Sequence, residues 1–271
     1  MNALLYKLTM GTYFLATLTY LAYLVKPRQT VGRVSHWLIS GGFVIHCMFT
    51  LDRYLEAGHT PITNLHESLS FFSLAIVGIF IAFERKFKVS ILGSFVTPVA
   101  LIILLVSALF PSAIAPLNPA LKSKWLAVHT TMAFFGYATF SVAFGAAIMY
   151  LIQEHFLKSK QLGPLYQKLP SLDVLDEINY RCLTFGFPLL TFAIITGAIW
   201  AETAWGTYWS WDPKETWSLI TWFIYAALLH GRLTTGWRGR RAAILAIIGF
   251  FVMLFTFLGV NLLLPGLHSY K

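Results

Sequence analysis

The sequence predicts an all-α integral membrane protein with about eight transmembrane helices. Its 271 residues are 57% hydrophobic and only 11% charged, whereas water-soluble domains carry about 25% charged residues. Apolar runs recur along the chain, most of them near the roughly 20 residues that a helix needs to cross the hydrocarbon. Helices are expected because a lipid-exposed backbone must satisfy its own hydrogen bonds, and no run shows the alternation of a membrane barrel strand.

The eight runs are expected at residues 6–25, 36–54, 67–83, 90–111, 126–152, 182–201, 216–231 and 242–263, within a single polytopic domain over 1–271. The first run lacks a strongly basic start and a small-residue cleavage site, so we interpret it as a retained span and not a signal peptide. The seventh run is the shortest. The polar connection 153–181 is predicted to be a cytoplasmic loop, and its end, "SLDVLDEINYR", has the apolar spacing of a short helix on the inner surface.

The basic residues predict the orientation. Fourteen of the 20 Lys and Arg residues lie in or beside the connections after the first, third, fifth and seventh runs. Such residues are retained in the cytoplasm, so both termini and the connection between the sixth and seventh runs are expected on the outer side. The net charge of +9 is spread over four short loops. It is therefore a topology signal, and no nucleic-acid partner is expected.

A tryptophan-rich segment, "ETAWGTYWSWDPKETWSLITW" at 202–222, joins the sixth and seventh runs. It holds five of the nine tryptophans: Trp205, Trp209, Trp211, Trp217 and Trp222. An aromatic belt at the bilayer surface would explain some of these rings, but it would not explain the charged residues among them. The segment instead favours a platform for a large, flat, apolar ligand with charged edges, because aromatic faces bury much area per side chain.

The charged residues of this segment predict a helix start. Asp212 suits the N-cap, Pro213 the first helical position and Glu215 the third. Exposed N–H groups of such a turn would receive a carboxylate. Lys214 would pair with a ligand propionate, with Glu215 or with Asp212.

Haem b fits this description, and the histidines supply axial ligands, since haem iron is commonly held by imidazole. His129 and His268 are expected at the outer level of the tryptophans, on two different helices. His230 lies 13 residues after Trp217, which is about 20 Å along a helix. It would hold a second haem at an inner level or simply cap the helix. His46 is a weaker intramembrane candidate. Cys47 and Cys182 form no CxxC pair and are expected to be buried hydrophobes.

These motifs resemble the haem-handling superfamily of cytochrome c maturation proteins that carry the tryptophan-rich WWD domain. Within it, the chain resembles the CcsA (ResC) family of the system II pathway, called CcsB in some bacteria. The match covers most of the chain, through "NLHESLSFF", "WLAVHTTMAFFGYATF", the tryptophan-rich segment, "LLHGR" and "GLHSY", in the family's order. The tryptophan-rich segment is the specific part.

The resemblance implies a haem-handling subunit that forms a holocytochrome c synthase (haem lyase) complex with a ResB/CcsB-type partner. Haem would pass to the outer face and be presented there to apocytochrome c, whose CxxCH thiols add to the haem vinyl groups. His230 would ligate haem within the membrane. The location would be the bacterial inner membrane or a thylakoid. The residues implied at the outer haem are His129, His268, Trp205, Trp209, Trp211, Asp212 and Trp217.

Three alternatives share these residues. The chain would be a haem exporter or channel without synthetase activity, a system I-type protein that delivers haem to a chaperone, or a membrane scaffold with an aromatic belt. Covalent attachment of haem to a coexpressed apocytochrome separates the first from a synthetase. A haem-free purified protein would indicate the scaffold.

Overall fold

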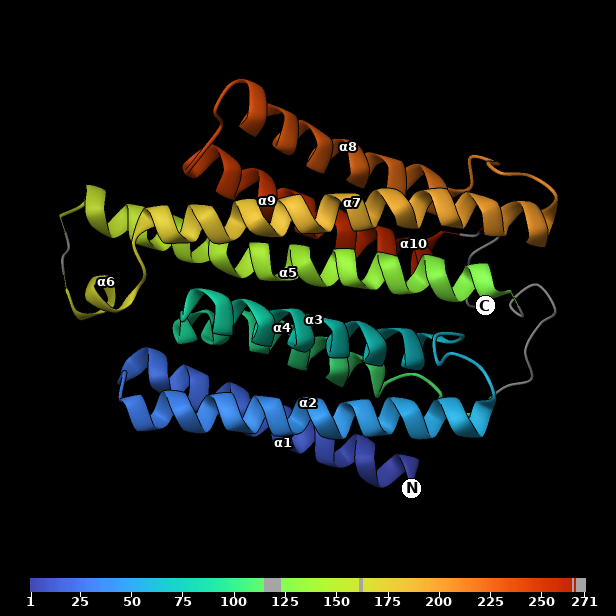
Figure 1. The fold of residues 1–271 in the computed structure, drawn as a ribbon, viewed down its shortest axis with the longest axis horizontal. Helices are drawn as coiled ribbons and strands as arrows, with labels where there is room; N and C mark the ends of the chain where they lie inside the picture. The colour runs from blue at the N-terminus through green and yellow to red at the C-terminus, as the bar shows by residue number, and fades with distance from the viewer. Residues whose placement is uncertain (115–122, 161–162, 265, 267–271) are drawn as a thin grey trace.

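The computed structural model describes residues 1–114, 123–160, 163–264 and 266, and the regular structure in these ranges is entirely helical. The helices run up and down in alternation (Figure 1). Their bounds are α1 Asn2–Val25, α2 Gln29–Ala57, α3 Leu65–Phe87, α4 Gly93–Ser107, α5 Lys124–Lys158, α6 Pro164–Lys168, α7 Leu172–Trp205, α8 Pro213–Thr234, α9 Arg240–Leu254 and α10 Val260–Leu263. A 3-10 turn, Ser90–Leu92, precedes α4, and a π-helical turn, Phe255–Gly259, joins α9 to α10.

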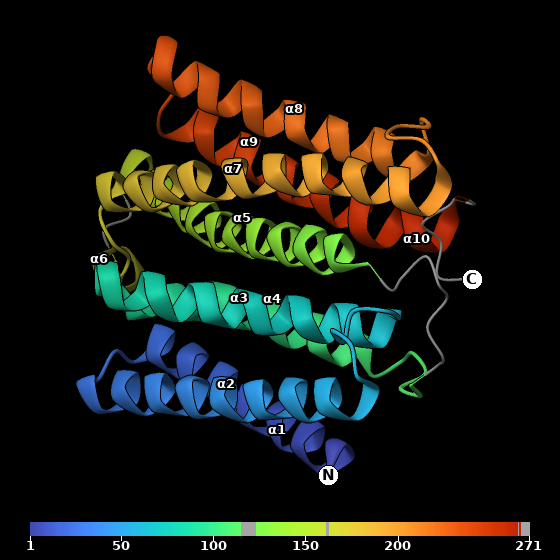
Figure 2. The ribbon, with the colours of Figure 1, turned by 45° about the vertical axis from the view of Figure 1, so that its right-hand side comes forward.

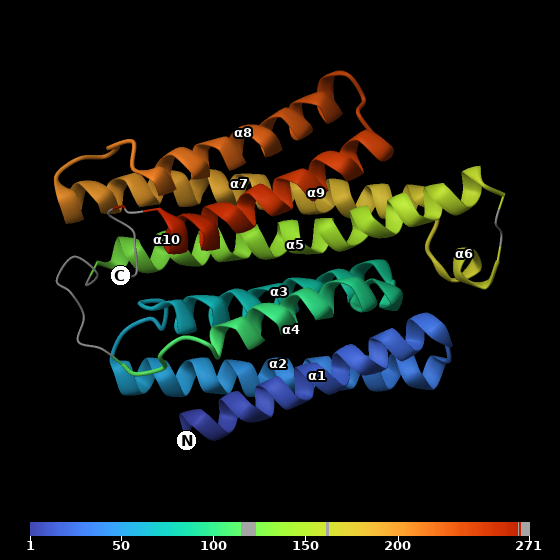
Figure 3. The ribbon, with the colours of Figure 1, turned by 180° about the vertical axis from the view of Figure 1, so that it is seen from behind.

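The helices form two groups that pack side by side. Helices α1 to α4 make one group, and α5 with α7 to α10 makes the other, as the turned view and the view from behind both show (Figures 2 and 3). The core lies between the groups, because α3, α4 and α5 are the most buried of the long helices. Large apolar side chains of α1, α2, α7 and α9 point outward instead. The exposed apolar surface matches a protein surrounded by lipid.

Within the described residues, seven helical segments are long and apolar enough to cross a membrane: α1, α2, α3, the stretch Ser90–Ser107, α5, α7 and the stretch Arg240–Leu263. The prediction of a helical, multi-pass membrane protein is thus confirmed. The seventh expected run, 216–231, is helical as part of α8, but α8 is not among those seven. Its length is sufficient, while its Thr, Trp and Tyr residues, with His230 and Arg232, lower its hydropathy. The count of eight spans therefore stays a prediction.

The two ends of the bundle differ in composition. At one end lie the α1–α2, α3–α4, α5–α7 and α8–α9 connections, which together with the adjoining helix ends carry most of the Lys and Arg residues; we call it the basic end. At the other lie the start of α1, the end of α10 and residues 206–212, and we call it the tryptophan end (Figure 1). The structure therefore separates the two sets of connections as the charge pattern predicts. Which end faces which compartment stays a prediction.

The connection between α5 and α7 differs from expectation. Helix α5 continues to Lys158, and residues 172–181 form the first turns of α7 instead of a separate surface helix. Ser171 starts this helix by accepting a hydrogen bond from the Val174 N–H, and Asp173 complements its N-terminus. No glycine or proline separates residues 172–181 from the apolar run, so one helix continues through both.

Helices α5 and α7 make the most extensive helix contact in the molecule. A small residue permits their close approach, since a Cβ on Gly136 would lie 3.3 Å from the Gly186 carbonyl oxygen. Small residues bring helix backbones together in membrane proteins in this way. The pair forms the rigid wall against which the candidate site is built.

Candidate functional site

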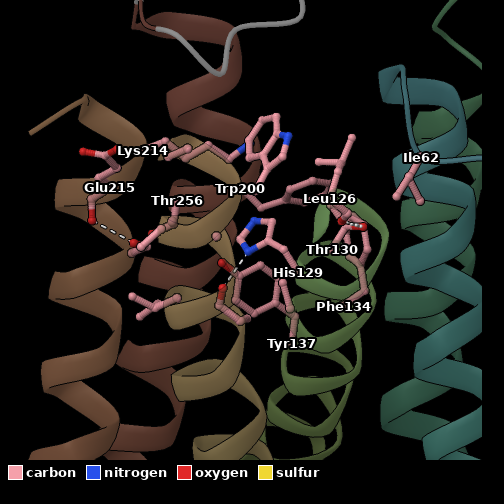
Figure 4. Close-up of a pocket in the computed structure, with 18 of the residues that line it drawn as sticks. Ile62, Leu126, His129, Thr130, Phe134, Tyr137, Trp200, Lys214, Glu215 and Thr256 are labelled. Carbon is pink, nitrogen blue, oxygen red and sulfur yellow. Dashed lines mark hydrogen bonds between the residues drawn. The ribbon is translucent and has the colours of Figure 1, made fainter. Parts of the chain in front are cut away.

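A cavity of about 560 Å³ opens at the tryptophan end, within the roughly 300–1,000 Å³ usual for small-molecule sites. Helices α5 and α7 form its long walls (Figure 4). The first turn of α8 and the π-helical turn close one side, and residues 62–65 with Phe110 and Pro111 close the other. The cavity thus draws on both helix groups.

His129 of α5 lines this cavity, and one of its two ring nitrogens is hydrogen-bonded within the protein. Its Nδ1 lies 2.6 Å from the Ala193 carbonyl oxygen of α7, drawn as a dashed line in Figure 4. A carbonyl only accepts, so Nδ1 carries the hydrogen and Nε2 keeps its lone pair. Metal-binding histidines generally donate their second nitrogen to a carbonyl or carboxylate in this way. His129 is therefore fixed in the tautomer that an axial ligand requires.

Two residues of α7 hold the imidazole in place. Gly197 leaves room for the ring, since a Cβ there would lie 2.6 Å from His129 Nδ1. Trp200 is buried and stacks on the ring, with centroids 6.4 Å apart and planes 17° from parallel. Trp205 in turn meets Trp200 edge to face at 4.7 Å. The histidine is thus clamped between a backbone carbonyl and an indole.

The five tryptophans of the segment divide between different places. Trp205 and Trp209 line the cavity, together with Tyr208. Trp211 does not line it; its side chain is 68% exposed and its backbone has a φ of 59°. Trp217 packs edge-on against Phe255 at 4.5 Å, and Trp222 donates to Thr191 Oγ1. The ligand roles predicted for Trp211 and Trp217 therefore rest on the sequence alone.

Asp212 caps α8 as the sequence predicts, with Pro213 in the first helical position and Glu215 completing a capping box. The Asp212 side chain accepts from the Lys214 N–H, and Glu215 Oε2 accepts from the N–H groups of Ser210 and Asp212. The expectation that exposed N–H groups here would receive a carboxylate is wrong, because the capping side chains already use these donors.

The other predicted histidine ligands lie elsewhere. His268 falls outside the described residues, although Gly266, two residues before it, lies against Asp212: a Cβ on Gly266 would be 2.5 Å from Asp212 Oδ2. His230 is exposed on α8, near the basic end. His46 is buried, and its two ring nitrogens meet Tyr13 and Ser70 at 3.1 and 2.9 Å. His46 is therefore a hydrogen-bonded core residue.

Sequence reasoning missed Trp200 and the wall made by residues 62–65. Trp200 lies outside the segment 202–222 and five residues before Trp205, which is not a same-face helical spacing; it shares a face of α7 with Gly197, three residues earlier. The 62–65 wall carried no sequence signal, because only tertiary packing brings the start of α3 to α5. Cys47 and Cys182 are both free, the first exposed and the second buried.

The arrangement is suited to a flat ligand that brings its own metal. Among the described residues, no three His, Cys, Asp or Glu side chains gather as they would around a bare metal ion. What the cavity offers is one oriented imidazole, several indole faces and one ammonium group, from Lys214. These groups fit haem, whose iron takes an imidazole and whose ring packs on aromatic faces.

The chain is similar to known proteins over most of its length. Residues 62–268 match the family model described as cytochrome C assembly protein. The chain is 44% identical to the cytochrome c biogenesis protein CcsA of Guillardia theta over 237 residues, covering 80% of this chain and 79% of the relative. It is 39% identical to the CcsA of Synechocystis sp. over 296 residues, covering 86% and 89%.

A solved structure shares the fold. The chain is similar to cytochrome c heme lyase CcmF with a TM-score of 0.70 at 18% sequence identity. The match covers 94% of this chain but only 46% of that protein. At this identity the likeness concerns the arrangement of the helices.

Proposed function

Because the chain belongs to the cytochrome c assembly protein family, in which its relatives are CcsA proteins, we propose that it is the haem-handling subunit of a system II cytochrome c synthetase. It would receive haem and hold it at the tryptophan end for attachment to apocytochrome c. The membrane would be a bacterial inner membrane or a thylakoid, with the tryptophan end on the outer side.

One observation carries the proposal. His129 presents a ring nitrogen with a lone pair in a cavity of about 560 Å³ that is lined by Trp200, Trp205 and Trp209. A histidine that only capped α5 would need neither a hydrogen bond to Ala193 nor a glycine at position 197. Gly197 leaves the space in which the imidazole ring lies between α5 and α7. Orientation of the imidazole is what an axial ligand needs.

His268 would supply the second axial ligand. Its neighbour in sequence, Gly266, already lies at Asp212, at the start of the helix that carries Lys214 and Glu215 into the cavity wall. With the iron held on both faces, oxygen chemistry at the metal would be blocked. The residues of this chain bind, orient and shield the haem. The thioether bonds form when each substrate S–H adds across a vinyl group, a step that needs no other reactant.

His230 would act separately. Its side chain is exposed, and it lies about 24 Å from Lys214 along α8, at a rise of 1.5 Å per residue. At that distance His230 cannot ligate the iron that His129 would bind. Its exposure suits contact with a ResB-type partner, which would supply the opposite ligand of a second haem within the membrane.

The test is haem content and the absorption spectrum of the purified protein. His129→Ala should remove the haem at the tryptophan end, and added imidazole should restore it, whereas His230→Ala should leave that haem in place. His155→Ala, an exposed histidine of the basic end, is the control. A His129→Ala protein with unchanged haem content and spectrum would overturn the proposal. Free haem released outside without covalent attachment, in the presence of partner and apocytochrome, would indicate an exporter.

A further inference from the structure

The C-terminal helix leaves α-helical geometry where it meets the cavity. Residues Phe255–Gly259 form a π-helical turn, after which α10 continues from Val260 to Leu263. Such turns are rare and concentrate at functional sites. This one directs Thr256 and Phe257 into the cavity wall and is followed by Asn261, a buried polar residue. The proposed function gives no role to Asn261.

Asn261 orients Lys214. The Lys214 Nζ donates to Asn261 Oδ1 at 3.1 Å, and Asn261 Nδ2 donates to the Phe257 carbonyl within the π-helical turn. These two bonds fix which way the amide faces. The amide carries no charge, so this bond orients the ammonium, and the Asp212 carboxylate also interacts with it electrostatically. Lys214 lines the cavity.

The opposite side of the cavity is mostly apolar. Ile62, Leu65, Phe110 and Pro111 supply its hydrocarbon surface, and the polar side chains of Thr63 and Asn64 are hydrogen-bonded to Glu67. In Figure 4, Lys214 and Ile62 lie on opposite sides of His129. Beside Lys214 the wall is polar, with Glu215, Ser218 and Thr256; the Glu215 carboxylate accepts from the Ser210 and Asp212 N–H groups. The cavity thus has a polar side that carries the Lys214 ammonium and a mostly apolar side, with the imidazole between them.

We propose that Lys214 and Asn261 form a carboxylate-binding corner that sets the orientation of the porphyrin in the cavity. The inference rests on the proposed function and deepens it. The corner takes the propionate edge of the ligand through a charge-assisted hydrogen bond. The edge away from the propionates, which carries the reactive vinyl groups, then faces Ile62 and Phe110. The polar and apolar sides of the cavity match the corresponding edges of the ligand.

If this corner binds a carboxylate, the cavity should prefer a porphyrin with free propionates over its ester, and a cavity lined by aromatic residues alone should not. Iron protoporphyrin with free propionates should bind more tightly than its dimethyl ester, which keeps the ring, the iron and the vinyl groups. A charge-assisted hydrogen bond in a partly buried site accounts for roughly a tenfold difference in affinity or more. Iron mesoporphyrin, which keeps the propionates but lacks vinyl groups, should bind like haem.

The experiment measures the affinity of the purified full chain for haem and for its dimethyl ester by absorption titration. We expect at least a tenfold preference for the free acid in the unaltered protein. Lys214→Met should abolish the preference while the spectrum of the His129-ligated iron remains. Lys214→Arg should keep the preference and Asn261→Leu should weaken it. Lys124→Met, an exposed lysine at the same end, is the matched control and should change nothing.

Equal affinity of the unaltered protein for haem and ester would overturn the inference, and this comparison needs no variant to fold. A full preference retained by Lys214→Met would overturn it as well. Failure of the unaltered protein to bind either porphyrin would instead overturn the proposed function.

Discussion

At the basic end, ion pairs join α7 to α8 and α5 to α9, whereas at the tryptophan end helices of the same group line a cavity of about 560 Å³. Asp176 of α7 accepts two bonds from the Arg232 guanidinium of α8, at 2.6 and 2.8 Å, and one from the Gly239 N–H. Glu154 of α5 pairs with Lys158 and with Arg240 of α9.

The tryptophan end of the same helices uses its polar groups differently. There His129 bonds a backbone carbonyl, Lys214 bonds an uncharged amide, and the acidic side chains of Asp212 and Glu215 are used in helix capping. In this helix group, ion pairs between helices lie at the basic end; at the tryptophan end the buried pair of Arg53 with Glu67 belongs to the other group, α1 to α4. Polar groups aimed into a cavity leave the other end able to bind a ligand. Four sets of substitutions test this division, in order of decreasing expected effect.

Gly197→Ala should have the largest effect. The added Cβ would lie 2.6 Å from His129 Nδ1, so the ring must move and lose its bond to Ala193. We expect haem content to fall at least tenfold, as for a misplaced metal ligand, without loss of the folded protein. Gly41→Ala is the matched control, because a Cβ there meets no atom within 4 Å. Equal haem content in the two variants would show that the His129 clamp is not needed.

Asp176→Asn should destabilise the bundle without emptying the cavity. The side chains of Asp176 and Arg232 are only 15% and 8% exposed, and breaking a buried pair costs about 3 kcal/mol. Thermal unfolding in detergent should show the loss, with haem per folded molecule unchanged. Glu177→Gln removes the neighbouring exposed pair with Arg181 and should cost at most about 0.5 kcal/mol. A haem loss specific to Asp176→Asn would contradict the division between the ends.

Asp212→Ala and Ser171→Ala remove equivalent N-caps at opposite ends. Each should cost about 1 kcal/mol of stability, measured by unfolding in the same detergent. Only Asp212→Ala should also weaken haem binding, because α8 carries Lys214 into the cavity wall. If both variants bind haem like the unaltered protein, the capping box does not support the site.

Trp211→Gly should have the smallest effect. The residue has a left-handed backbone conformation, which costs a non-glycine residue roughly 1–2 kcal/mol. Glycine relieves this strain but makes the unfolded chain more flexible, so stability should change by less than about 1 kcal/mol. Haem should stay bound, whereas Trp205→Ala should weaken binding because Trp205 lines the cavity. Haem loss from Trp211→Gly would place Trp211 at the ligand after all.

The sequence by itself determined the helical membrane class, the distribution of basic residues between two ends and the helix start at Asp212. These follow from local physics: apolar length for a span, charge retention on one side of the membrane, and an N-cap that satisfies donors within three residues. It also identified His129 as a candidate ligand, because the predicted topology puts this histidine at the same outer level as the tryptophan-rich segment.

Only the tertiary structure decided which of those residues share a cavity. Trp211 and Trp217 stand within the same motif as Trp205, yet the fold points them elsewhere, while Trp200 and the 62–65 wall join the site from outside the motif. The contacts of His129 with Ala193 and of Lys214 with Asn261 join residues 64 and 47 positions apart. Such contacts depend on how whole helices pack against one another, and no local sequence pattern specifies that packing.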